Sequence, residues 1–258
     1  MTQDEMNILV LGKLRMIEEE FDVKVLLAVE SGSRAWGFAS PDSDFDVRFI
    51  YKRPKDHYLH LQKTQDVIEL PVDDTWDVNG WDLDKTLRLL FKSNPTLFEW
   101  MQSPICYRRT DFIDRIAPLM QDYFSPKNMI YHYLNTARAH VKTYLQDDFV
   151  IAKKYFYAIR PLLACEWVAD TNTAPPVLFD DLVKAYLPES LRAPLDYLLD
   201  IKLHSEEKAV IPSLPEMNSY IEKSIAHFDF IVNNMPKEEW KDWDALNIFF
   251  LSELSNDE

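Results

Sequence analysis

The chain has 258 residues, of which 47% are hydrophobic and 28% are charged, and its formal net charge is −15. This composition excludes disordered, collagen-like and low-complexity proteins. The negative charge argues against a protein that coats nucleic acid with its whole surface, although it is compatible with a local basic groove. Only four glycines occur, where average usage of about 7% would give roughly eighteen, so a mostly helical chain with few tight turns is favoured.

Two cysteines, Cys106 and Cys165, stand in apolar segments and provide no disulfide framework. The N-terminal residues include acids and lack the basic region of a signal peptide. No apolar run approaches the ~20 residues that span a bilayer. We therefore expect reduced thiols in a cytoplasmic protein that has no membrane partner.

Hydrophobic periodicity predicts a first helix that ends near Phe21, followed by a series of strands. The predicted strands are Val23–Val29, Asp44–Ile50, Val67–Leu70 and Thr75–Asn79. The first strand is almost continuously apolar, which is typical of a strand buried on both faces. The second strand alternates apolar and polar residues, so one of its faces is polar. Asp82 is expected to cap a further helix that ends before Pro95.

The remainder of the chain is predicted to be helical. The expected helices begin near Asn94, Thr110, Ser125, Phe149, Pro176, Glu189, Leu214 and Lys241. Several have a proline near the first turn, where its missing N–H costs nothing. These prolines are Pro95, Pro126, Pro215 and Pro176. The pattern predicts an α/β domain over residues 1–124 and an all-helical domain over residues 125–258.

The segment that joins the first two strands combines residues suited to phosphate and metal chemistry. Gly32 permits a close backbone approach, and Ser33 offers a hydroxyl and an N–H at the start of a helix. Asp44 and Asp46, two apart on a strand, project from one face and can bind divalent cations together. Two such ions clamp the attacking and leaving oxygens of a phosphoryl displacement. In a chain with 43 acidic residues only the combined pattern is informative.

A third carboxylate is needed to hold the ion that activates the acceptor hydroxyl. Asp77 is favoured, because apolar residues flank it in a strand-like pattern. The alternatives are Asp82, which is better explained as a helix cap, and Asp73 and Asp74, which fall in a predicted turn.

Three segments resemble the RlaP-type group of predicted nucleotidyltransferases, within the polymerase β-like superfamily. They are Ser31–Gly37, Ser40–Ile50 and Asn79–Leu83, and the stretches Asn94–Trp100 and Lys154–Ala164 are also similar. The resemblance implies an α+β fold, in which a small mixed-sheet nucleotidyltransferase core precedes an all-helical domain. It also implies Mg²⁺ or Mn²⁺ as cofactor and an NTP as substrate.

The resemblance also implies roles for particular residues. Gly32 and Ser33 form the turn that binds the triphosphate. Asp44 and Asp46 are metal ligands, and Asp77 is the third carboxylate. Each of the three acids is therefore expected to be both a metal ligand and part of the catalytic set.

Basic residues supply further candidate ligands for the nucleotide. Arg34 follows Ser33 directly and is favoured as a phosphate ligand. Arg48 shares a strand face with the carboxylates, so it either pairs with them or meets a phosphate.

A locally basic segment, residues 127–160, contains Lys153, Tyr157 and Arg160 at helical spacing. We expect this face to bind the triphosphate and to stack a base on Tyr157. The alternative is an ordinary solvated helix face.

The sequence thus predicts a nucleotidyltransferase that moves an NMP unit from an NTP to an acceptor hydroxyl and releases pyrophosphate. An RNA end is the favoured acceptor, because the RlaP-type group is associated with RNA repair and because the chain has a basic helix. A protein hydroxyl, as in toxin-like NMP transferases, and a small molecule are alternative acceptors. A non-catalytic nucleotide sensor is the rival class, which would not need the third acid.

Overall fold

The computed structural model describes residues 3–40, 43–62, 64–72, 75–204, 209–237 and 241–255. The chain forms two compact units. The α/β unit contains Met1–Ala35, Asp44–Tyr123 and Trp240–Glu258, and the helical unit contains Trp36–Ser43 and Phe124–Glu239. The sequence predicted a single boundary after residue 124. In the structure, residues 36–43 belong to the helical unit and residues 240–258 belong to the α/β unit. The division into domains stays a prediction.

The α/β unit is built on a five-stranded mixed sheet of order β3-β4-β2-β1-β5. The strands are β1 (Lys24–Glu30), β2 (Phe45–Lys52), β3 (Val67–Glu69), β4 (Trp76–Asp82) and β5 (Cys106–Arg109). β2 pairs in parallel with β4, and the other pairs are antiparallel. This sheet with its helices confirms the predicted α+β class.

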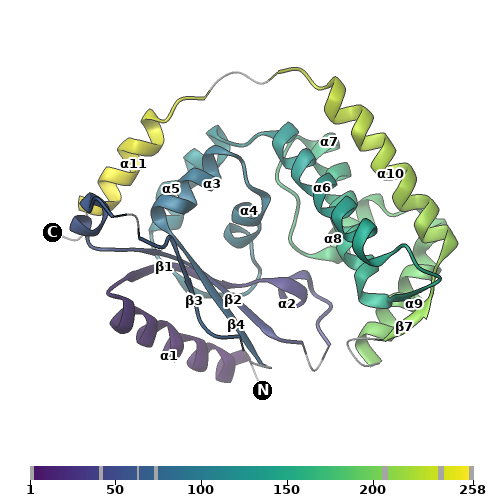
Figure 1. Cartoon of the computed structure of the whole chain (residues 1–258), viewed down its shortest axis with the longest axis horizontal. Coiled ribbons are helices and arrows are strands. Elements are labelled where there is room, and N and C mark those ends of the chain that lie inside the picture. The colour runs from purple at the N-terminus through teal and green to yellow at the C-terminus, as the bar shows by residue number, and fades with distance from the viewer. Residues whose placement is uncertain are drawn as a thin grey trace. The chain divides into compact units, whose positions relative to one another are not determined.

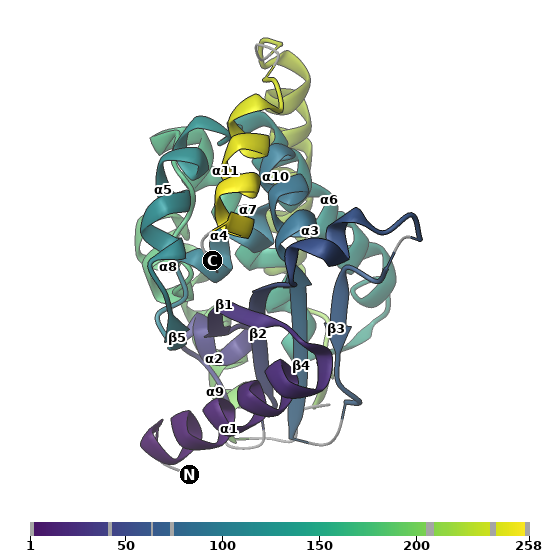
Figure 2. The same ribbon diagram turned by 90° about the vertical axis from the view of Figure 1, so that its left-hand side faces the viewer.

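Helices cover both faces of this sheet (Figures 1 and 2). The helices of this unit are α1 (Gln3–Phe21), α2 (Gly32–Trp36), α3 (Leu83–Phe91), α4 (Pro95–Met101), α5 (Phe112–Asp122), α11 (Asp244–Ser255) and the short 3-10 helix η1 (Lys55–Leu59). The first helix runs along one face alone, and α3 and α5 lie on the other. The apolar stripe of α1, which includes Val10, Leu14 and Ile17, packs on Val47, Phe49 and Val78 of the sheet. The helix predicted to end near Phe21 is thereby confirmed.

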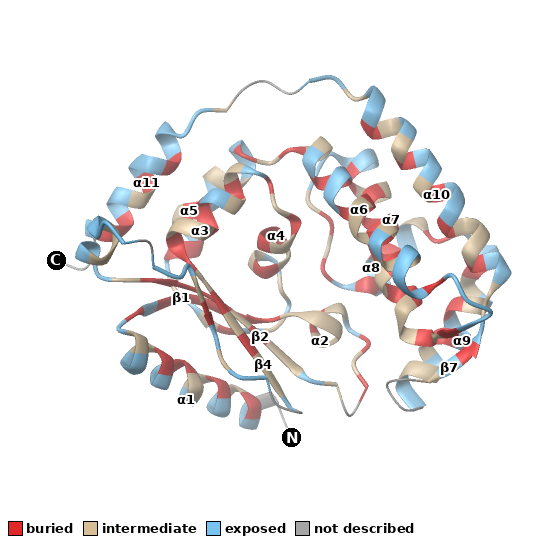
Figure 3. Cartoon of the chain, in the orientation of Figure 1, coloured by how far each residue is buried: buried red, intermediate tan, exposed pale blue. Residues whose placement is uncertain are grey.

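The helical unit is packed around α7, which contributes ten buried residues (Figure 3). Its elements are α6 (Pro126–Tyr144), β6 (Phe149–Ile151), η2 (Ala152–Tyr155), α7 (Phe156–Thr171), α8 (Phe179–Tyr186), η3 (Glu189–Leu191), α9 (Arg192–His204), β7 (Val210–Pro212) and α10 (Pro215–Asn234). Phe38 also belongs to this unit. It is 7% exposed, and its ring centroid lies 4.9 Å from that of Phe156 and 5.2 Å from that of Phe179.

Two helix starts in this unit were predicted wrongly. The helix expected near Phe149 begins at Phe156, because Phe149–Ile151 pairs with β7 as a strand and a 3-10 turn follows. The helix expected near Pro176 begins at Phe179, so this proline precedes the helix instead of standing in its first turn.

Helix capping follows the sequence closely. The Asp82 and Ser125 side chains accept hydrogen bonds from main-chain N–H groups of α3 and α6, which confirms Asp82 as a cap. Pro95, Pro126 and Pro215 stand at the first turn of their helices. Asn172 ends α7 in the left-handed conformation, with φ of 55°, where glycine is more usual. Among the described residues, no helix is both long and apolar enough to cross a membrane.

Candidate active site

The parallel pairing of β2 with β4 brings two of the predicted acids side by side. Asp46 is the register partner of Asp77. Val47 and Val78, the next residues on each strand, are buried in the core beneath α1. Because side chains alternate along a strand, Asp46, Arg48 and Asp77 share the sheet face that points away from α1. The alternation therefore separates the core face from a polar face that carries the candidate chemistry.

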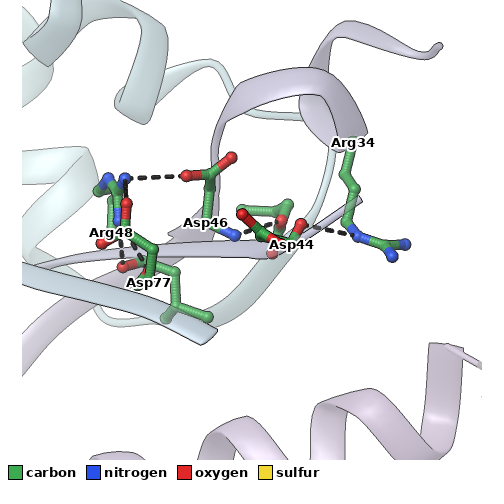
Figure 4. Close-up of polar contacts among 7 residues, drawn as sticks. Arg34, Asp44, Asp46, Arg48 and Asp77 are labelled. Carbon is green, nitrogen blue, oxygen red and sulfur yellow. Dashed lines mark hydrogen bonds and ion pairs between the residues drawn. The ribbon is translucent and has the colours of Figure 1, made fainter. Parts of the chain in front are cut away.

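The guanidinium of Arg48 joins the two carboxylates (Figure 4). Its Nη2 donates to Asp46 Oδ1 at 2.9 Å and to Asp77 Oδ2 at 2.7 Å. Its Nη1 also donates to the main-chain oxygen of Asp77 at 2.7 Å. The side chains of Asp46 and Asp77 are 27% and 30% exposed. Of the two roles predicted for Arg48, the structure thus shows the ion pair.

The electrostatics of this group favour a further cation. Burial raises the pKa of Asp46, Arg48 lowers it, and the charges of Asp77 and Asp44 raise it again. The Arg48 guanidinium thus bridges Asp46 and Asp77, and the charge of Asp44 adds to theirs. Carboxylate oxygens are hard ligands of the kind that Mg²⁺ and Mn²⁺ prefer, and Mg²⁺ is commonly held by one or two carboxylates plus substrate phosphates. The Asp46–Asp77 pair fits that requirement.

Asp44 stands apart from this pair. It precedes β2 and is exposed, and its main-chain oxygen accepts a hydrogen bond from Arg34 Nε at 3.1 Å. In the described parts of the chain, no three or more His, Cys, Asp or Glu residues form a group that could hold a metal ion. The acids are thus brought together as a pair with a charged neighbour, and a role for all three as metal ligands stays a prediction.

The Gly32 turn packs directly against the Asp46 carboxylate. The backbone N–H of Ser31 donates to the main-chain oxygen of Asp46 at 2.9 Å. Gly32 has φ of +59°, and a Cβ placed there would lie 1.9 Å from Asp46 Oδ2. A close approach at this glycine was predicted for a phosphate, and in this structure the group that approaches is Asp46. Ser33, the next residue, is half-buried in the first turn of α2.

Arg34 lies next to Asp44, and its side chain extends away from Asp46 and Asp77 (Figure 4). In addition to the hydrogen bond to Asp44, its guanidinium carbon lies 3.8 Å from the centroid of the Phe45 ring. The side chain is therefore held at the start of β2, and its role as a phosphate ligand stays a prediction.

Glu30, which the sequence reasoning did not select, contacts this group directly. Its side chain is fully buried, with 0% exposure, at the end of β1. Oε1 accepts from the Asp46 N–H at 2.9 Å, and Oε2 accepts from the Tyr107 hydroxyl at 2.5 Å. Burial raises the pKa of Glu30 to about 7. The sequence feature that could have identified Glu30 is its position at the end of an apolar strand, two residues before Gly32.

Of the alternative third acids, Asp82 is not part of this group. Asp82 lies at the opposite end of β4 from Asp77, and its Oδ1 accepts from the Asp84 N–H and the Tyr58 hydroxyl. Asp73 and Asp74 lie outside the described residues.

Lys153, Tyr157 and Arg160 belong to the helical unit. They do not share one helix, because Lys153 lies in η2 and α7 begins after it. Arg160 is 3% exposed, with its guanidinium carbon 4.5 Å from the centroid of the Trp36 ring. Tyr157 makes an edge contact with Trp36. Their role as nucleotide ligands stays a prediction.

A mixed sheet in which neighbouring strands present carboxylates next to a Gly-Ser turn is the arrangement typical of polymerase β-like nucleotidyltransferases. Comparison with known proteins agrees with this class. Residues 6–252 match the model of the RlaP family, described as an RNA repair pathway DNA polymerase beta family. The uncharacterized protein YcgL of Bacillus subtilis (strain 168) is 44% identical over 218 residues, which are 84% of each chain.

Among solved structures, a nucleotidyltransferase-like protein from Exiguobacterium sibiricum 255-15 is similar with a TM-score of 0.30 and 12% identity, over 85% of this chain and 73% of that one. The chain belongs to the RlaP family of nucleotidyltransferases. The predicted resemblance is confirmed.

Proposed function

We propose that the protein is a metal-dependent nucleotidyltransferase that moves an NMP unit from an NTP to an acceptor hydroxyl and releases pyrophosphate. The observation that carries this proposal is the placement of Asp46 and Asp77 on neighbouring parallel strands beside the Gly32 turn. An RNA end is the favoured acceptor, supported by the description of the family as one of RNA repair.

In this reaction the acceptor oxygen forms a bond to the α-phosphorus of the NTP. The bond from that phosphorus to the oxygen bridging to the β-phosphorus breaks, so pyrophosphate leaves with the electron pair. The acceptor hydroxyl loses its proton. Mg²⁺ or Mn²⁺, held by Asp46 and Asp77 with Asp44 nearby, would neutralise charge on the triphosphate and at the acceptor oxygen.

Side chains of the α/β unit would do the remaining work. Asp77 is 30% exposed and on the polar sheet face, where its carboxylate is available to help remove the acceptor's proton. Ser33 and Arg34 would hold the β- and γ-phosphates. Arg48 bridges the two carboxylates and would hold them in place relative to each other. Catalysis of this kind depends chiefly on positioning and on charge stabilisation.

In the helical unit, Lys153 and Tyr157 are half-buried and are our candidates for a phosphate contact and a base-stacking contact. Arg160 would affect nucleotide binding indirectly, because it is buried against Trp36. Replacing Lys153 and Tyr157 separately by alanine, with nucleotide affinity as the readout, tests these roles.

The proposal is tested by incubating the full chain with each labelled NTP and Mg²⁺ or Mn²⁺, against total RNA and total protein. Transfer of label to RNA supports the RNA acceptor, and transfer to protein supports the toxin-like alternative. Absence of any metal-dependent NTP turnover would refute the proposed enzymatic function and favour the alternative, a non-catalytic nucleotide sensor.

Two variants test the site. The double variant Asp44→Ala with Asp46→Ala and the single variant Asp77→Asn are expected to abolish transfer. Asp196→Asn, which changes an exposed acid on α9 in the helical unit, is the matched control and is expected to retain it. Retained activity in the double variant would refute the assignment.

A further inference from the structure

Asp46 is fixed through its main chain as well as its side chain. Its N–H donates to Glu30 Oε1 at 2.9 Å, and its carbonyl oxygen accepts from the Ser31 N–H at 2.9 Å. The second of these bonds extends the β1–β2 main-chain pairing beyond its last register pair, Glu30 with Val47. Both main-chain polar groups of Asp46 are therefore held by the end of β1.

The Glu30 side chain that makes one of these bonds is itself held firmly. Its second oxygen accepts from the Tyr107 hydroxyl on β5. Its main-chain N–H donates to Ile105 at 2.9 Å, and its main-chain oxygen accepts from Ser103 Oγ at 2.6 Å. Glu30 thus connects β5 and the segment before it to Asp46 across the full width of β1.

A carboxyl group in this place carries a cost in stability. Glu30 is fully buried, and burial disfavours its charged form more than the hydrogen bonds from Tyr107 and Asp46 and the charge of Arg34 favour it. The two hydrogen bonds that the Glu30 carboxylate accepts come from a main-chain N–H and a hydroxyl, which are both uncharged donors. A residue that served only packing would avoid that cost.

We propose that Glu30 and Tyr107 are positioning residues, which hold the main chain of Asp46 so that its carboxylate is placed to bind the divalent cation. This inference rests on the proposed function, because it assigns a cation to Asp46. It adds two residues that do not touch the cation or the nucleotide, one of them on a strand at the edge of the sheet.

The inference makes the hydrogen-bonding geometry of residue 30 more important than its charge. Glu30→Gln keeps an oxygen that can accept from the Asp46 N–H, and its amide can donate to the Tyr107 oxygen. Glu30→Met has a similar unbranched length but offers only a weak acceptor. Tyr107→Phe removes the bond that orients Glu30 and leaves its ring in place.

The experiment is titration of Mn²⁺ into the full chain, followed by electron paramagnetic resonance, which reports cation binding without requiring catalysis. Glu30→Met is expected to bind Mn²⁺ about tenfold more weakly than the wild type, the size of one lost hydrogen bond to a charged group. Tyr107→Phe is expected to weaken binding severalfold. Glu30→Gln is expected to stay close to the wild-type affinity.

The control is Tyr186→Phe, which removes a tyrosine–carboxylate hydrogen bond of 2.7 Å to Asp170 within the helical unit. It is expected to leave Mn²⁺ affinity unchanged. Circular dichroism checks that each variant is folded, and if Glu30→Met does not fold, Tyr107→Phe decides the question.

Wild-type Mn²⁺ affinity in folded Glu30→Met or, where that variant does not fold, in Tyr107→Phe would overturn the proposal. Equal losses in Glu30→Gln and Glu30→Met would do so as well, because they would make charge the decisive property. Failure of the wild type to bind Mn²⁺ also overturns it. A wild type that binds Mn²⁺ but turns over no NTP refutes the proposed function alone.

Discussion

Replacing Gly32 by alanine is the most direct perturbation of the candidate site. The added Cβ would lie 1.9 Å from Asp46 Oδ2 and 2.8 Å from its Cγ, whereas real Cβ contacts are essentially never shorter than 3.0 Å. The carboxylate must therefore move by about 1 Å or the turn must open. Either movement disturbs the 2.9 Å contact of Asp46 Oδ1 with Arg48.

The size of the effect follows from these distances. The left-handed conformation of residue 32, with φ of +59°, costs a residue with a Cβ about 1–2 kcal/mol of folding free energy. Misplacement of a catalytic group by about 1 Å costs on the order of 100-fold in rate. We therefore expect Gly32→Ala to remain folded, with kcat for metal-dependent NMP transfer lower by about two orders of magnitude.

The assay is NMP transfer with saturating NTP and Mg²⁺, together with thermal unfolding. Gly12→Ala is the matched control, because a Cβ at Gly12, inside α1, meets nothing within 4 Å. It is expected to keep wild-type activity and to stabilise the helix by about 1 kcal/mol. Wild-type kcat in Gly32→Ala, or an equal loss of activity in Gly12→Ala, would refute the reasoning.

Three further predictions concern charge and packing. Burial raises the folded-state pKa of Glu30 from 4.5 to about 7, so the stability that its protonated form contributes is present below pH 4.5 and is lost as the pH rises toward 7. Glu30→Gln does not titrate, so its free energy of unfolding should gain about 3 kcal/mol over that of the wild type between pH 4.5 and 8. Urea unfolding in metal-free buffer measures this difference. Gly80→Ala, whose Cβ would lie 2.2 Å from the Phe49 ring, should lower Tm by several degrees, and a Tm equal to that of Gly12→Ala would contradict this. Arg48→Met removes the guanidinium that Asp46 and Asp77 share, so added Mg²⁺ should raise the Tm of this variant more than that of the wild type. An equal or smaller rise would count against Mg²⁺ binding between Asp46 and Asp77.

Much of the α/β unit was predictable because its signals are local. The spacing of apolar residues in α1 and the alternation along β2 each fall within one element, and both predicted which side chains face the core. The same alternation placed Asp46 and Arg48 on one polar face. The cap at Asp82 was predictable for the same reason, since a cap and its helix are adjacent in the sequence.

The contacts that decide residue roles are not local. Tyr107 is 77 positions from Glu30 and Asp77 is 29 positions from Arg48, so their pairing depends on strand order and register, which the local pattern does not contain. The sequence therefore left two roles open for Arg48 and passed over Glu30. The short strands β5, β6 and β7 have three or four residues each, too few for alternation to be recognised.

Glycine positions show the same division. Gly32, Gly37 and Gly80 all fall within the segments that resemble the RlaP-type group. Gly32 does contact Asp46, but Gly80 makes room for the Phe49 ring on the core side of the sheet, and the neighbour of a Cβ at Gly37 would be Leu178. Only the fold distinguishes a glycine needed by a carboxylate from one needed by an aromatic ring.

The path of the chain through its two units constrains how the protein can be divided. The chain passes from one unit to the other after residues 35, 43, 123 and 239, so neither unit is a continuous stretch of sequence. A fragment that ends at residue 123 would carry residues 36–43 without the Phe156 and Phe179 rings that bury Phe38, and it would lack α11. Truncation and domain exchange, which serve well for proteins built from consecutive modules, are therefore poor tools here, and point variants of the full chain are the appropriate means of dissecting this enzyme.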